Sequence, residues 1–230
     1  MTQQFKAILW DNDGILVNTE PLYAQAVQQV FDRIGFVGDA EELYKHYTIR
    51  LGTHVWDPVQ KQLALSEEDV DELRQERDKN YEILLDQGAP IIPHTEEVLK
   101  KLRPYFSMGI VTSCQRKHLE IIHTQTGFFQ YFDFRIARED FVQTKPNPEP
   151  YLLAFKKVEA LHATPLQKNE ILVIEDSERG VISAKEAGMT CFAIPTSLTK
   201  DTDLSRADRI LESIEELPSL VLSSHTCCGI

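Results

Sequence analysis

Six short apolar runs recur along this chain, and their length and spacing restrict the fold more than any other feature. Each run has five or six residues bounded by turn signals, which is typical of a strand buried on both faces of a sheet. Helical patterns separate most of them, so we predict a doubly wound parallel α/β sheet, in which ligands bind beyond the carboxyl ends of the strands. The runs are Phe5–Trp10, Met108–Thr112, Phe132–Ala137, Ile171–Glu175, Cys191–Pro195 and Ala207–Leu211.

The stretch from residue 18 to residue 90 breaks this alternation. It has no convincing strand and two amphipathic helical patterns, of which the first closes at Gly35 and the second opens at Ser66, in a sequence that resembles a capping box. We therefore expect a core domain made of residues 1–17 and 91–230, with a small α-helical domain inserted as residues 18–90.

Composition excludes several classes of protein. The chain has 230 residues, of which 42% are hydrophobic, so it can bury a core without disulfide or metal staples. No window approaches the roughly 18 apolar residues that a membrane span needs. The net charge of −12 argues against nucleic acid and anionic membranes as partners. The four cysteines show no metal-ligand spacing, and we expect a reduced, cytoplasmic protein whose terminal Cys227 and Cys228 form an ordinary tail rather than a prenylation box.

Paired acids follow two of the predicted strands. Asp11 and Asp13 come directly after the first run and can point the same way, since strand residues alternate between faces. Glu175 and Asp176 end the fourth run. Carboxylates gathered at a core boundary are costly unless they share a proton or hold a cation, and oxygen ligands without His or Cys suit Mg²⁺. A turn or helix-cap role for these acids is the simpler alternative.

Two further elements offer groups that could bind an anion. Thr112 and Ser113 end the second run and open directly into a helical pattern, where a hydroxyl and free backbone N–H groups can hold a phosphate. Lys145 lies in a proline-rich segment, Thr144–Pro150, that holds the backbone extended around one cation. We interpret Lys145 as an electrostatic clamp, although an isolated lysine is ordinarily a solvated surface charge.

In order and spacing, these four elements closely resemble the signature motifs of the haloacid dehalogenase-like (HAD) hydrolase superfamily. The resemblance covers nearly the whole chain. The flanking segments 17–22, 145–151 and 175–180 are similar to the helical-cap branch, which contains phosphoglycolate phosphatase, β-phosphoglucomutase and small sugar-phosphate phosphatases. The resemblance implies a Rossmann-like core with a small α-helical cap domain, and it identifies the 18–90 insert with that cap.

The resemblance also implies a role for each site residue. Asp11 would be the nucleophile, and Asp13 would be the general acid and base. Mg²⁺ would be held by Asp11, the backbone carbonyl of Asp13, Asp176 and Glu175, the last either directly or through water. The phosphoryl oxygens would be held by Thr112, Ser113 and Lys145. Because Asp13 is present, we expect phosphate-ester chemistry rather than dehalogenation.

The substrate expected from this resemblance is a small phosphorylated metabolite, such as a sugar or polyol phosphate. We interpret the segment 45–54 as a specificity loop of the cap, because Gly52 permits a tight turn and Arg50 or His54 could reach a polar leaving group. A basic, solvated loop on an acidic protein is the alternative. A hexose-phosphate mutase is one alternative, weakened because Tyr23 stands where the mutase has a histidine. A non-catalytic regulator that binds a phosphometabolite is another. We expect a monomer and leave a dimer open.

Overall fold

The computed structural model describes residues 4–222, so Cys227 and Cys228 lie outside the described residues. The chain forms two compact units. Unit 1 holds the chain up to Asn18 and again from Ile91 onward, and unit 2 is Thr19–Pro90. Among residues 4–222, no helix combines the length and apolar character that crossing a membrane would require.

Unit 1 is built on a six-stranded parallel sheet with the order β3-β2-β1-β4-β5-β6. All six predicted strands are confirmed, and their ends lie within two residues of the predicted ones. The central strands are buried along their whole length, which explains why they read as continuous apolar runs. The strands are β1 Ala7–Trp10, β2 Ser107–Val111, β3 Phe134–Ile136, β4 Ile171–Glu175, β5 Thr190–Ala193 and β6 Arg209–Ile210.

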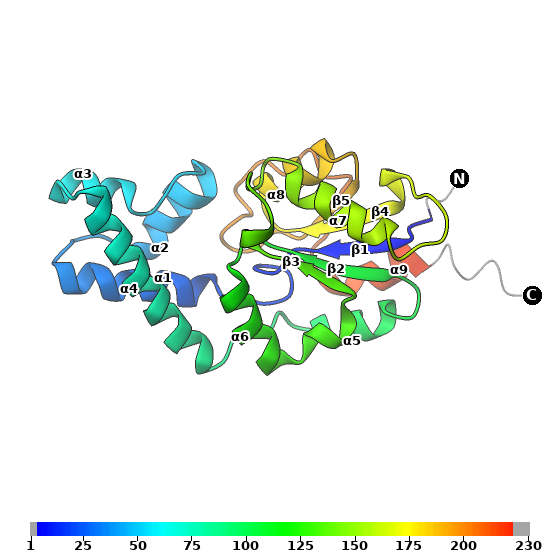
Figure 1. Ribbon diagram of the computed structural model, residues 1–230, viewed down its shortest axis with the longest axis horizontal. Helices are drawn as coiled ribbons and strands as arrows, with labels where there is room; N and C mark the ends of the chain where they lie inside the picture. The colour runs from blue at the N-terminus through cyan, green and yellow to red at the C-terminus, as the bar shows by residue number, and fades with distance from the viewer. Residues whose placement is uncertain (1–3, 223–230) are drawn as a thin grey trace, which may run out of the picture. The chain divides into compact units, whose positions relative to one another are not determined.

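Helices cover both faces of this sheet (Figure 1). Alternate residues of β1 enter different cores: Ile8 and Trp10 face one helical layer, while Ala7 and Leu9 face the other. The first layer contains α5 Thr95–Leu102, α6 Arg116–Thr126 and α9 Leu217–Leu222, and the second contains α7 Glu149–Glu159 and α8 Glu178–Glu186. Short 3₁₀ turns complete the unit at η2 Phe128–Tyr131, η3 Arg138–Asp140, η4 Lys168–Glu170 and η5 Ile214–Glu216. The architecture is the Rossmann-like α/β fold predicted from the sequence.

Unit 2 is entirely helical in its regular structure. Its two long helices are α1 Glu20–Ile34 and α4 Glu67–Asp86. Gly35 ends α1 in the left-handed conformation, with φ 69°, and Ser66 begins α4 with a capping box in which the Asp69 N–H donates to Ser66 Oγ at 3.1 Å. Both helix signals read from the sequence are therefore confirmed. Apolar residues of the two helices form one small core that includes Val27, Val30, Phe31, Val70 and Leu73.

Between the two long helices the structure adds three short ones that the sequence patterns did not predict. They are α2 Ala40–Leu43, the π-helix η1 Tyr44–Arg50 and α3 Asp57–Leu63. The segment interpreted as a specificity loop is thus helical up to Arg50, and its turn is completed by Gly52, which has a φ of 66°. The side chains of Arg50 and His54 are exposed.

Candidate active site

The carboxyl ends of β2, β1 and β4 bring three of the predicted motifs to one edge of the sheet. Trp10 is in register with Ile110 on one side and with Ile174 on the other. The Asp11 N–H continues the ladder by donating to the Ile174 carbonyl at 3.0 Å. The next residues on the three strands, Val111, Asp11 and Glu175, therefore lie level with one another. This is also where the strand order reverses between β1 and β4, the usual ligand position in such sheets.

Lys145 joins these strand ends. Its Nζ donates to Asp11 Oδ1 at 2.7 Å, to the Val111 carbonyl at 2.9 Å and to Glu175 Oε1 at 2.7 Å. All three protons of the ammonium group are used, and the residue is only 6% exposed. Lys145 is therefore a buried cation shared by two acidic motifs, rather than the solvated surface lysine of the simpler alternative.

Glu175 is fully buried and uses both of its oxygens. Oε1 accepts from Lys145 and, at 2.6 Å, from the hydroxyl of Tyr151. Oε2 accepts from the Asp176 N–H and from Ser177 Oγ, both at 3.2 Å. These four hydrogen bonds satisfy a carboxylate that would otherwise be very costly to bury. They also fix its orientation toward Lys145.

The charges of this cluster oppose one another strongly. Burial, followed by the charge of Glu175, raises the pKa of Asp11 to about 8 against the lowering effect of Lys145, and Asp13 adds to the rise. Burial alone would lower the pKa of Lys145, but the adjacent Asp11 and Glu175 carboxylates reverse the effect and raise it. The site therefore holds more negative charge than its one lysine can balance.

A cation would correct this imbalance, and the residues present fit one. Carboxylate oxygens of Asp11, Glu175 and Asp176 all lie within 4.8 Å of one another, and all three residues are buried. Such an all-oxygen cluster suits a hard divalent ion such as Mg²⁺. Gly14, with φ 81°, lets the first motif approach this cluster, because a Cβ at that position would lie 2.5 Å from Asp176 Oδ2.

Thr112 and Ser113 follow directly after β2, but they do not open directly into a helix as predicted, because α6 begins only at Arg116. Thr112 follows the carbonyl that accepts from Lys145, is 1% exposed, and its Oγ1 accepts from the Cys114 N–H at 2.9 Å. Ser113 is exposed, and the chain then enters α6. Asp13 is half-buried, and its charge acts on Asp11.

Several supporting residues escaped the sequence analysis. Arg179 Nε donates to the Lys145 carbonyl at 3.1 Å, and Ser183 Oγ donates to the Asn147 carbonyl at 2.6 Å, so α8 holds the segment that carries Lys145. Asn147 Oδ1 accepts from the N–H of Glu149, the first residue of α7, at 2.9 Å. Their closeness to Glu175 and Lys145 in the sequence indicated that they could support the site. Their hydrogen-bond partners could not be predicted, because these depend on the packing of α8 against α7.

Gly180 is a further such residue, and it supports a strong prediction. A Cβ there would lie 1.9 Å from Glu175 Cδ, closer than any real contact. Gly180→Ala must therefore displace Glu175 from Lys145 and Tyr151, and we expect activity to fall by at least about 100-fold, since misplaced active-site groups cost this much. Phosphatase assays and thermal melts of Gly180→Ala test this, with Gly35→Ala as a control: a Cβ there meets nothing within 4 Å, so the left-handed backbone at φ 69° should lower the melting temperature while activity stays at the wild-type level. Full activity in Gly180→Ala would contradict the described position of Glu175.

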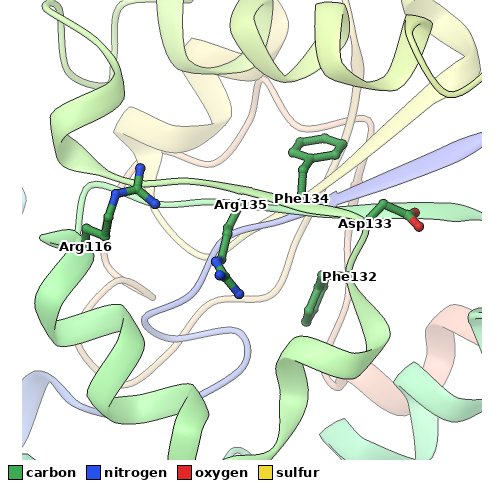
Figure 2. A pocket seen from close by; sticks show the side chains of 5 residues that line it. All are labelled: Arg116, Phe132, Asp133, Phe134 and Arg135. Atoms are coloured by element: carbon green, nitrogen blue, oxygen red, sulfur yellow. The ribbon is translucent and has the colours of Figure 1, made fainter.

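A separate pocket of about 370 Å³ lies along the edge strand β3. Figure 2 shows Arg116 entering it from the start of α6, beside Phe132, Asp133, Phe134 and Arg135 from the segment that contains β3. None of the predicted catalytic or metal-binding residues lines it. The active site is therefore assigned from the acidic cluster and not from this pocket.

Comparison with known proteins agrees with this geometry. The family model of the haloacid dehalogenase-like hydrolases matches residues 8–194. This chain belongs to that family. Its core carries Asp11, Lys145 and Glu175 in one hydrogen-bonded cluster at the strand ends.

Several HAD relatives of this chain are named as phosphatases. Validoxylamine A 7'-phosphate phosphatase of Streptomyces hygroscopicus subsp. limoneus is 31% identical over 221 residues, which cover 93% of this chain and 96% of that protein. Phosphoglycolate phosphatase of Vibrio vulnificus (strain CMCP6) is 27% identical and covers 97% of this chain and 100% of its own. The crystal structure of CbbY from Rhodobacter sphaeroides in complex with phosphate shares the fold, with a TM-score of 0.75 and 22% identity, over 93% of this chain and 96% of that one. The chain is thus a HAD-type phosphoric monoester hydrolase.

Proposed function

We propose that this protein is a Mg²⁺-dependent phosphatase that hydrolyses a small phosphorylated metabolite, a sugar or polyol phosphate, through an aspartyl-phosphate on Asp11. The observation that carries the proposal is the position of Lys145, which donates at 2.7 Å to both Asp11 and Glu175. Because Lys145 Nζ already donates to three acceptors, it would release Asp11 Oδ1 as that carboxylate attacks and donate to a phosphoryl oxygen instead.

In the first half-reaction, an Asp11 carboxylate oxygen forms a bond to phosphorus as the bond from phosphorus to the ester oxygen breaks. Asp13 gives its proton to the departing alkoxide. In the second half-reaction, Asp13 takes a proton from water, and the water oxygen forms a bond to phosphorus as the bond from phosphorus to the Asp11 oxygen breaks. The products are inorganic phosphate, the free alcohol and the original Asp11 carboxylate. Thr112, Ser113 and Lys145 hold the phosphoryl oxygens during both steps.

Charge balance supports a requirement for the metal. Two like charges 4 Å apart repel by about 4 kcal/mol at an effective dielectric constant of 20. A phosphate dianion therefore enters a strongly unfavourable cluster of carboxylates, of which Lys145 neutralises only one charge. Mg²⁺ held by Asp11, Asp176, Glu175 and the Asp13 carbonyl would supply the remaining positive charge and favour the ionised form of Asp11.

The proposed substrate class rests on the relatives and on unit 2. Fructose-1-phosphate phosphatase YqaB of Escherichia coli (strain K12) is 25% identical to this chain, and its name specifies a sugar phosphate. We propose that unit 2 acts as a cap in which Arg50 or His54 contacts the leaving group. Both side chains are exposed and flank the Gly52 turn, which supports a contact role.

Phosphorus-31 NMR of the protein with Mg²⁺ and a panel of sugar and polyol phosphates, β-glucose 1-phosphate included, tests the proposed function. We expect an inorganic phosphate signal to grow for some panel members and to vanish with EDTA.

Arg50→Ala, run in parallel, should change the preferred metabolite more than the rate on an activated aryl phosphate. Phosphoryl transfer between sugars without release, or turnover unaffected by EDTA, would contradict the proposal.

A further inference from the structure

We propose that His123, on α6 and outside the four motifs, is a positioning residue that holds the Asp11–Asp13 segment through the side chain of Asn12. This inference rests on the proposed function, in which Asp11 accepts the phosphoryl group and Asp13 transfers the protons. The hydrogen bonds described for His123 go to Asn12 and Thr126. His123 acts on the residue between Asp11 and Asp13.

A direct buried contact connects His123 and Asn12. His123 Nε2 lies 2.7 Å from Asn12 Oδ1, although the residues are 111 positions apart in the sequence. His123 is 1% exposed and Asn12 is fully buried. The contact therefore connects α6 to the loop at the end of β1. Because both residues are shielded from water, this hydrogen bond is stronger than one at the surface.

The surroundings of His123 fix its ring and its tautomer. Asn12 Oδ1 can only accept, so His123 Nε2 is the protonated nitrogen and donates to it. Nδ1 then accepts from Thr126 Oγ1 at 3.0 Å, and that oxygen accepts in turn from the Phe128 N–H at 3.3 Å. Burial, together with the nearby charge of Arg135, lowers the pKa of His123 to about 3, so the ring is neutral. The rings of Phe128 and Phe129 lie 5.8 Å and 5.2 Å from it and hold its plane.

Asn12 passes this constraint to both catalytic acids. Its own carbonyl accepts from the N–H groups of Leu16 at 2.8 Å and of Val17 at 3.2 Å, which closes the turn that follows Asp13. With its side chain held by His123 and its main chain held by the turn, Asn12 has little freedom to rotate. Asp11 and Asp13 are its covalent neighbours, so their backbone directions are held as well.

The buried hydrogen bond between His123 and Asn12 stabilises the fold less than an apolar contact would, which points to a role in orienting the Asp11–Asp13 segment. Within residues 4–222, Asn12 Nδ2 is buried without a hydrogen-bond partner. A buried polar group in that state is unfavourable, and an apolar pair of the same volume would avoid it. What the polar pair adds is a fixed direction for the segment between the nucleophile and the general acid.

The test compares His123→Gln with His123→Leu on an aryl phosphate with saturating Mg²⁺. The glutamine amide can donate near the position of Nε2, whereas leucine cannot. We expect His123→Leu to lower kcat by about 10- to 100-fold with KM changed less than about threefold, as for other residues that orient a catalytic group. His123→Gln should recover most of kcat. Asn12→Leu should cause a similar loss, and adding His123→Leu to it should cause little more.

Thermal melts of each variant separate this role from a loss of folding. Equal losses of kcat in the Gln and Leu variants, full kcat in His123→Leu, or additive losses in the double variant would overturn the inference. If His123→Leu does not fold, the comparison of His123→Gln with Asn12→Leu tests the inference instead. A wild-type kcat in both of these variants would overturn it. Absence of metal-dependent turnover in the wild type would instead refute the proposed function. Nitrogen-15 NMR of labelled histidine gives an independent readout, since protonation on Nδ1 alone would contradict the described hydrogen bond.

Discussion

Asp11→Asn should remove turnover almost completely, with kcat reduced by at least about 10⁴-fold, as expected when a covalent nucleophile is lost. The amide cannot form an acyl-phosphate, because it is a very poor nucleophile toward phosphorus. It keeps the shape of the carboxylate, and its Oδ1 can still accept from Lys145 Nζ. Steady-state assays on an aryl phosphate, with circular dichroism to verify the fold, provide the measurement.

Deamidation of the new asparagine would restore the native residue, so intact mass must be measured on the same sample. The matched control is Asp201→Asn, an exposed aspartate after the last long strand, which should keep wild-type kcat. Substantial activity in a folded Asp11→Asn sample free of aspartate would contradict the covalent mechanism.

Lys145→Met should have the second large effect, on stability as well as on activity. The substitution removes the only charge that pairs with Asp11 and Glu175 in the described contacts, and leaves both carboxylates buried. Breaking a buried ion pair in this way costs about 3–5 kcal/mol of unfolding free energy. Chemical denaturation in EDTA measures the loss. Activity should fall with it, since the proposed hydrogen bond from Lys145 to the phosphoryl oxygens is lost.

The control for Lys145→Met is Lys156→Met, at an exposed position on α7. It should change the unfolding free energy by less than about 0.5 kcal/mol. The double variant Lys145→Met with Glu175→Gln should be more stable than Lys145→Met alone, because one of the unpaired charges is gone. A Lys145→Met protein as stable as the wild type would show that the lysine is not buried against these acids.

The sheet and the main site residues could be predicted because their signals are local. A strand buried on both faces must be apolar along its whole length, so the runs ending at Trp10 and Ile174 stand out. Parallel pairing then places the next residues, Asp11 and Glu175, at one edge. The capping box at Ser66 is also local, since both of its partners lie within one turn of helix.

The contacts that hold the site could not be predicted, because they depend on packing between distant elements. Tyr151 belongs to an apolar helical pattern, and nothing in that pattern indicates that its hydroxyl meets Glu175. The bond from His123 to Asn12 joins α6 to the end of β1. The short helices α2 and α3 escaped for another reason: four and seven residues are too few to show a period.

Trapping the phosphorylated enzyme tests the central claim most directly. The wild type is mixed with an aryl phosphate and Mg²⁺, quenched in acid during turnover, and reduced with borohydride, which converts an aspartyl-phosphate to homoserine. We predict homoserine at position 11 by peptide mass spectrometry. We predict none in samples that lack substrate, or in Asp13→Asn samples to which substrate is added only after the quench. Asp13→Asn, which lacks the base of the second half-reaction, should accumulate the adduct when it is quenched during turnover. No reducible adduct in either protein, or an adduct at any position other than Asp11, would contradict the account.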